Sequence, residues 1–214
     1  MQTVADEAGT NKMMLHYYFR SKHQLFDVIF EEDYKELIAP LGAILRNPEL
    51  HVEEQIVTFV RRYHETMMAH PKFPLFMMHE FSKNPQRLLD LAKKVMPVSK
   101  DDEPDHPKLS ATTFMDQVDQ GVREGKYNED VDSSHLAVSL TGMCIYPFVS
   151  RIGVQSAYQF TDEQYQEFLE KRKEEVISHT FRILMKPEYY QLWKDSKQVP
   201  VKTDFGKQKE SVSK

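Results

Sequence analysis

The side chains best suited to chemistry lie near the start of the chain. From Thr10 to Gln24 there are three basic residues and two histidines but no acidic residue. Lysine and arginine bind the phosphates of a nucleic acid, and lysine also donates to guanine in the major groove. The whole chain carries a net charge of −5, so this basic segment contrasts with an acidic remainder. Such a distribution favours DNA contact at one end only, because acidic surface repels the phosphate backbone.

Other residue types offer less chemistry. The nine histidines include no pair at helical metal-ligand spacing: His64 and His70 are too far apart, and His79-Glu80 has no second histidine nearby. No G-x-S-x-G motif is present, and the single cysteine, Cys144, lies in an apolar segment, where a thiol is usually inert. We therefore predict no enzyme activity, no catalytic residue, no metal site and no cofactor.

Two short helices would position the basic residues. The first should end at Gly9, which supplies the turn. Thr10 or Asn11 can cap the second, which should extend roughly to Phe19. Leu15 and Phe19 are four residues apart and should face inward. The basic and aromatic side chains of the second helix should then face outward.

The predicted DNA contacts are of two kinds. Lys12 suits the guanine acceptors, whereas tyrosine and lysine side chains further along suit phosphate oxygens. Taken alone, the basic residues also fit a solvated helix face, and the two tyrosines fit partial core packing, with one ring half-buried. The predicted DNA-binding residues are Thr10, Asn11, Lys12, His16, Tyr17, Tyr18 and Lys22.

This segment resembles the helix-turn-helix of the TetR family of transcriptional regulators. The family pattern is I-A-x-x-A-G-V-S-x-x-x-L-Y-x-H-F-x-S-K-x-x-L. The in-register matches are Val4-Ala5, Ala8-Gly9, Leu15, Phe19, Ser21-Lys22 and Leu25. His16 stands where the family usually has a DNA-contacting tyrosine, and histidine can also donate to phosphate. The family has one more helix before the position of Met1, so we expect a head that lacks its first helix and a natural start upstream.

Helical spacing continues through the rest of the chain. Ser21 and Gln24 fit a capping box at the start of a long helix, which Pro40 should bend or interrupt at one of its turns. Further helices are predicted at 52–69, from Pro74, from Pro85, and at 109–123, 136–151 and 161–185, with a polar loop at 99–107. The apolar stripe of the 52–69 helix is Ile56, Phe59, Val60, Tyr63 and Met67. Gly125 lies where a left-handed cap would end the 109–123 helix, Ser133 or Ser134 should cap the next helix, and Thr161 with Gln164 fits a capping box. Sustained strand alternation is absent from the sequence. The predicted fold is therefore all-α.

The resemblance implies three parts. Residues 1–46 would form the helix-turn-helix head, lacking its first helix, with a connecting helix. Residues 47–193 would form an effector-binding and dimerisation domain, and residues 194–214 a disordered tail, which is rich in lysine and poor in apolar residues.

Methionine and aromatic side chains in the middle helices could be plain core, but they also suit the irregular effector cavity that the resemblance implies. The predicted ligand-binding residues are Phe59, Tyr63, Met67, Phe76, Met77, Phe81, Met115 and Tyr146.

The last two long helices carry apolar residues around much of their circumference, and these residues need a packing partner. That partner is either the chain's own core or, as the resemblance implies, a second subunit in a four-helix bundle. The predicted dimer-interface residues are Leu140, Cys144, Phe148, Phe168, Val176, Thr180, Phe181 and Leu184.

The predicted function is a cytoplasmic transcriptional regulator. By resemblance, a homodimeric repressor binds double-stranded operator DNA and is released by an unknown small, largely apolar effector. The alternative is a helical ligand-binding or protein-interaction module that has lost DNA binding with its first helix. No apolar run approaches the ~20 residues that a membrane span requires, so no membrane partner is predicted.

Overall fold

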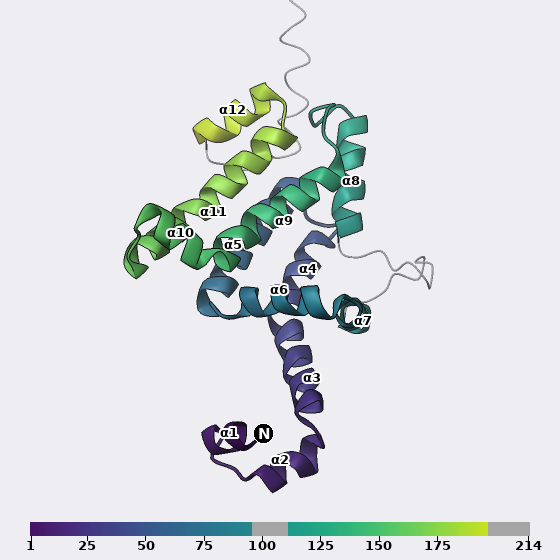
Figure 1. The fold of residues 1–214 in the computed structure, drawn as a ribbon. Coiled ribbons are helices and arrows are strands. Elements are labelled where there is room, and N and C mark those ends of the chain that lie inside the picture. The colour runs from purple at the N-terminus through teal and green to yellow at the C-terminus, as the bar shows by residue number, and fades with distance from the viewer. Residues whose placement is uncertain (96–110, 197–214) are drawn as a thin grey trace, which may run out of the picture. The chain divides into compact units, whose positions relative to one another are not determined.

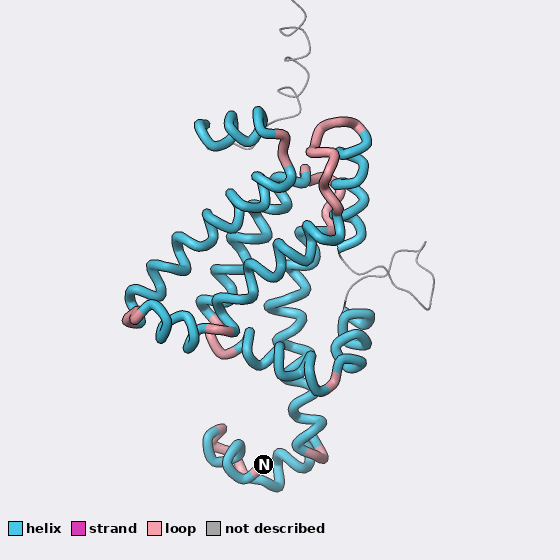
Figure 2. The backbone as a smooth tube through the Cα atoms, turned by 45° about the horizontal axis from the view of Figure 1, so that its top comes forward, coloured by secondary structure: helices cyan, strands magenta, loops and turns pink. Residues whose placement is uncertain are grey.

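The computed structural model describes residues 1–95 and 111–196. Within these residues the regular secondary structure is helical, and an isolated antiparallel bridge joins Tyr127 to Met185 (Figure 2). The all-α prediction is confirmed. The predicted loop at 99–107 lies outside the described residues. The chain divides into two compact units, Met1–Pro40 and Leu41–Lys214, a few residues before the predicted boundary at 46.

The first unit contains three helices followed by a widened helical turn. The helices are α1 (Gln2–Glu7), α2 (Lys12–Phe19) and α3 (Lys22–Asp33). A π-helical turn, Tyr34–Ile38, then leads into α4 (Ala39–Leu45), which contains Pro40. Proline has no N–H, and its ring clashes with the carbonyl one turn earlier, so a widened turn before it relieves both problems. Of the two effects predicted for Pro40, the structure shows the interrupted turn.

The second unit continues with α5 (Val52–Ala69), α6 (Phe73–Lys83), α7 (Pro85–Val95), α8 (Ala111–Arg123), α9 (Ser133–Val149), α10 (Arg151–Tyr158), α11 (Asp162–Leu184) and α12 (Pro187–Ser196). Helix α10 was not predicted. Helix α12 extends through Lys194 and Asp195 to Ser196, so the predicted disordered tail was placed too early; its remainder lies outside the described residues.

Local capping signals set several boundaries. Thr161 and Gln164 form the predicted capping box of α11. A serine was predicted to cap α9, but Asp132 does so, because its Oδ1 accepts from the amides of Ser134 and His135, each at 2.9 Å. Hydrogen bonds from the Ser134 side chain and the His135 amide hold the pKa of the Asp132 carboxyl below its usual range. A carboxylate at a helix N-terminus also interacts favourably with the helix dipole.

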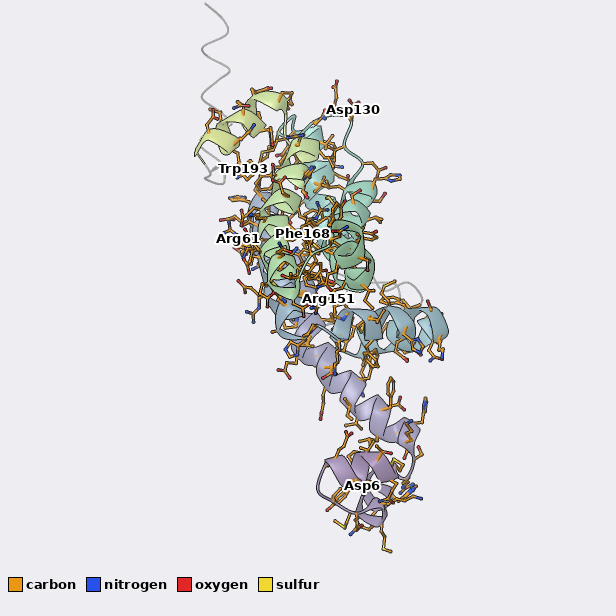
Figure 3. All side chains as sticks on the ribbon, turned by 60° about the vertical axis from the view of Figure 1, so that its left-hand side comes forward. Asp6, Arg61, Asp130, Arg151, Phe168 and Trp193 are labelled. Atoms are coloured by element: carbon orange, nitrogen blue, oxygen red, sulfur yellow. The ribbon has the colours of Figure 1, made fainter. Side chains whose placement is uncertain are left out.

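The core of the second unit lies among α5, α9 and α11, which pack against one another (Figure 1). Helix α5 buries the predicted stripe Ile56, Phe59, Val60, Tyr63 and Met67, whose three- and four-residue spacing places these side chains on one face. Each such side chain contributes about 1.5–3 kcal/mol relative to exposure. The opposite face of α5 is polar and carries Arg61 (labelled in Figure 3), which binds Glu174 of α11 at 3.3 Å.

A buried carboxylate fixes the connection between α8 and α9. Glu53 has no exposed surface; it pairs with Lys126 Nζ at 2.9 Å and accepts from the Tyr127 hydroxyl at 3.0 Å. Gly125 ends α8 with φ +70°, as the sequence predicts. Gly121 faces the Tyr127 ring so closely that a Cβ there would lie 2.3 Å from a ring carbon. Only glycine therefore lets the tyrosine reach the carboxylate.

We expect Gly121→Ala to destabilise the chain. The new methyl group must push away the Tyr127 ring, which is buried and hydrogen-bonded to Glu53. Overpacking of this kind costs about 1–3 kcal/mol, which urea unfolding would measure. Gly153→Ala is the matched control, because a Cβ there meets nothing within 4 Å, and it should be neutral or stabilising. Equal effects of the two substitutions would contradict the steric argument.

Candidate nucleic-acid interface

The first unit forms a helix-turn-helix. Helices α1 and α2 pack against each other, with Ala5 and Leu15 buried. Gly9 makes the turn with φ +62°, and the Thr10 amide donates to the Ala5 carbonyl at 2.9 Å. A positive φ costs glycine nothing, whereas it strains a residue with a Cβ. The turn predicted at Gly9 is confirmed.

Side-chain caps fix the ends of the helices that flank the second turn. Asn11, rather than Thr10, caps α2: its Oδ1 accepts from the Met14 amide at 2.8 Å. Ser21 caps α3 by accepting from the Gln24 amide at 3.1 Å, which is the first of the two hydrogen bonds of the predicted capping box. Asn11 therefore acts as a positioning residue, because its oxygen is already occupied.

His16, one of the predicted phosphate contacts, already has a hydrogen-bond partner within the first unit. His16 Nδ1 donates to the Arg20 carbonyl at 3.2 Å, since a carbonyl can only accept. In the neutral ring, Nε2 then carries a lone pair and cannot donate to a phosphate. His16 can therefore make the predicted phosphate contact through Nε2 only when its ring is protonated.

All seven predicted DNA-binding residues are exposed, and two of them, Asn11 and His16, also make hydrogen bonds to the backbone. Tyr17 is 77% exposed and Tyr18 66% exposed, and their rings meet edge-to-face at 5.3 Å. The prediction that one ring is half-buried is wrong. The inward side of so short a helix is filled by Leu15 and Phe19, which leaves no room for either tyrosine.

The sequence reasoning missed two exposed methionines on α2. Met13 is 80% exposed and Met14 43% exposed. The signal was present in the spacing, since Met13 lies one turn before Tyr17 on a helix whose inward side is marked by Leu15 and Phe19. The outward face of α2 is therefore partly apolar, and attention to the basic residues alone overlooked it.

Most of the predicted ligand-binding residues lie in the interior of the second unit. Phe59, Tyr63, Met67 and Met77 are buried, and Phe76 and Met115 are half-buried. Phe81 and Tyr146, at 52% and 65% exposed, point to solvent. These two side chains therefore lie apart from the buried group. The sequence spacing of α6 and α9 does not by itself indicate which side of each helix faces the core.

A polar group that the sequence analysis did not select lies among these rings. His64 is buried between Tyr63 and Phe148, with ring centroids 6.2 and 5.4 Å away. Its Nδ1 donates to the Val60 carbonyl at 3.0 Å, and its Nε2 is buried with no hydrogen-bond partner among the described residues. Burial lowers the pKa of His64 and so favours the neutral ring, in which Nε2 is a hydrogen-bond acceptor that has no donor within the described part of the chain.

The predicted dimer-interface residues belong to the core of one chain. Seven of the eight are buried: Leu140, Cys144, Phe148, Val176, Thr180, Phe181 and Leu184. The eighth, Phe168 (labelled in Figure 3), is half-buried and stacks on Tyr165 with ring centroids 5.9 Å apart. Helices α5, α9, α11 and α12 bury these apolar side chains against one another within the chain. For example, the ring centroids of Trp193 and Phe181 lie 4.8 Å apart. This residue set is therefore wrong as a contact surface for a second chain.

The exposed side of α9 is different in character. Helix α9 contains no aspartate, glutamate, lysine or arginine, and it exposes Val138, Gly142 and Tyr146 at helical spacing. Ile152 of α10 is also exposed. An uncharged, apolar helix face open to water is unusual for a monomer and indicates an interaction surface.

No protein-family model matches this chain, and no curated protein matches it. Among the described residues, no group of three or more His, Cys, Asp or Glu side chains is placed to hold a metal ion. No single described helix is long and apolar enough to cross a membrane; α9 and α10 pass that test only as a pair, bent by 72°.

We expect Cys144 to be unreactive in the folded chain. It has no exposed surface, and burial raises the pKa of its thiol to about 12, so the nucleophilic thiolate is scarce at neutral pH. Ellman's reagent should label it only at the rate of unfolding, and fully in denaturant. Fast labelling of the native chain would show that the core around Cys144 does not enclose its thiol.

Proposed function

We propose that this chain is a DNA-binding transcriptional regulator. One observation carries the proposal: α2 is capped by Asn11, held against α1 by a glycine turn, and exposes a face with basic and aromatic residues. No acidic residue lies between Thr10 and Gln24. A helix of this kind fits the major groove with its N-terminal residues toward the base edges.

The charge arrangement supports DNA over an acidic partner. Lys12, Arg20 and Lys22 are exposed within a short stretch of the first unit, whereas the chain as a whole is acidic. Each lysine or arginine that neutralises a phosphate releases counterions, so binding should depend steeply on salt. Tyr17 and Tyr18 add hydroxyl donors at the same surface.

A dimer would let two such heads read successive major grooves about 34 Å apart. We propose the uncharged face of α9, formed by Val138, Gly142 and Tyr146, as the contact between two copies. The glycine lets two helix backbones approach closely, and the apolar neighbours gain by leaving water. This surface replaces the buried set that the sequence suggested.

The second unit would bind the effector. Tyr63, His64 and Phe148 gather three rings, and the unpartnered His64 Nε2 calls for a hydrogen-bond donor. These features favour a small, largely apolar molecule that carries one donor group. Mass spectrometry of molecules retained by the purified chain would identify it.

We expect Lys22→Ala to weaken binding to every DNA sequence and to lower the slope of log affinity against log salt by about one per half-site. Lys12→Ala should weaken binding selectively by about 1–3 kcal/mol at one base position if Lys12 contacts a base edge. Fluorescence anisotropy on DNA selected from a random pool measures both effects. Lys171→Ala is the control, because Lys171 lies on α11 and pairs with Glu167. Unchanged binding by both head variants, or failure to select any DNA, would refute the proposal.

We expect the full chain to sediment as a dimer at micromolar concentration, and Val138→Lys to sediment as a folded monomer. A lysine there would place a charge in the apolar contact while remaining solvated in the free subunit. Leu75→Lys is the control, because Leu75 is exposed on a different helix, α6, and this substitution should leave the dimer intact. Sedimentation velocity with circular dichroism separates loss of association from loss of folding. A monomeric parent chain would eliminate the two-headed arrangement.

A further inference from the structure

The rotation of α2 places Met13 on its outermost face. At about 100° per residue, Met13 lies about 200° around the helix from Leu15, the buried residue that marks the inward direction. Tyr17, one turn later, shares this face, and these two side chains are 80% and 77% exposed. Lys12 lies only about 60° from Leu15 on the same wheel, so it projects from the flank.

An exposed methionine in the first turn of this helix needs a partner with an apolar surface. Burial of its side chain is favourable, and its flexible thioether adapts to an irregular surface. The surrounding charges restrict the choice, because every fixed charge from Thr10 to Gln24 is positive. The partner should thus combine negative charge with small apolar groups.

Double-stranded DNA with thymine in the groove meets both requirements. Its backbone is anionic, and the 5-methyl group of thymine is the apolar group that a base pair presents in the major groove. The first turn of a recognition helix is the part that approaches the base edges. Lys12 would approach the base edges from the flank through its long, flexible side chain, whereas Met13 would face the floor of the groove directly.

We propose that Met13 is a specificity-determining residue that reads the 5-methyl group of a thymine in each half-site. This inference rests on the proposed DNA binding. Contact between the methionine side chain and the methyl group buries one methyl, which corresponds to about a fourfold change in affinity per half-site. Uracil pairs like thymine but lacks that methyl group, so it isolates the contact.

The test begins with DNA selected from a random pool by the full chain. Each thymine of the selected half-site is replaced by uracil in turn, and the dissociation constant is measured by anisotropy. We expect one thymine at which uracil weakens binding about fourfold per half-site. Placing 5-methylcytosine at that position should recover part of the methyl contact, whereas unmodified cytosine should not.

The variants assign the effect to one side chain. Met13→Ala should bind thymine and uracil equally at that position, and Met13→Leu should retain part of the difference. Met14→Ala is the matched control, since Met14 lies to the side of the face and is about half as exposed, and it should keep the full difference. Alanine and leucine both favour helices, so the fold of α2 should persist.

The outcomes separate the two claims. If no DNA sequence is selected, the proposed function fails, and this inference fails with it. If DNA is selected but no thymine responds to uracil, or if Met13→Ala keeps the response, the reading by Met13 is wrong while DNA binding stands.

Discussion

The second unit depends on a carboxylate that has no exposed surface. An ionised Glu53 is tolerable only because Lys126 and Tyr127 supply a positive charge and a hydrogen bond. Tyr127 in turn bridges to Met185, and the adjacent Asn128 amide donates to the Leu184 carbonyl at 3.0 Å. A single buried charge on α5 thereby fixes the α8–α9 connection and the end of α11.

The first unit is organised on a different principle. Few of its side chains are buried, and the position of α2 is set mainly by local features: a glycine turn before it, an asparagine cap at its start and a serine cap on the following helix. Segments with few buried contacts open at low free-energy cost. The direction in which Met13 and Tyr17 project therefore depends on the Asn11 cap at the start of α2 and on the turns that flank this helix.

The features that the sequence predicted well are those set by neighbouring residues. The turn at Gly9, the cap at Ser21, the limits of α5 and the capping box at Thr161 depend on residues within one turn. Burial was predicted poorly where it depends on tertiary packing. The apolar stripes that contain Leu140 on α9 and Phe181 on α11 would have the same spacing whether they packed against the chain's own core or against another subunit. The sequence therefore could not separate these two cases. The exposure of Met13 was readable from helical rotation, but the exposure of both Tyr17 and Tyr18 depended on how little else the small unit contains.

Helix α12 is held by aromatic and polar contacts on one face of α11. Trp193 is buried edge-on against Phe181, and the Tyr190 hydroxyl lies 3.0 Å from Ser178 Oγ and 3.2 Å from Arg182. The chain has one tryptophan, so its entire indole fluorescence originates at this contact. The emission wavelength of the native protein thus reports whether α12 remains packed against α11, and it can be followed without a label during any titration.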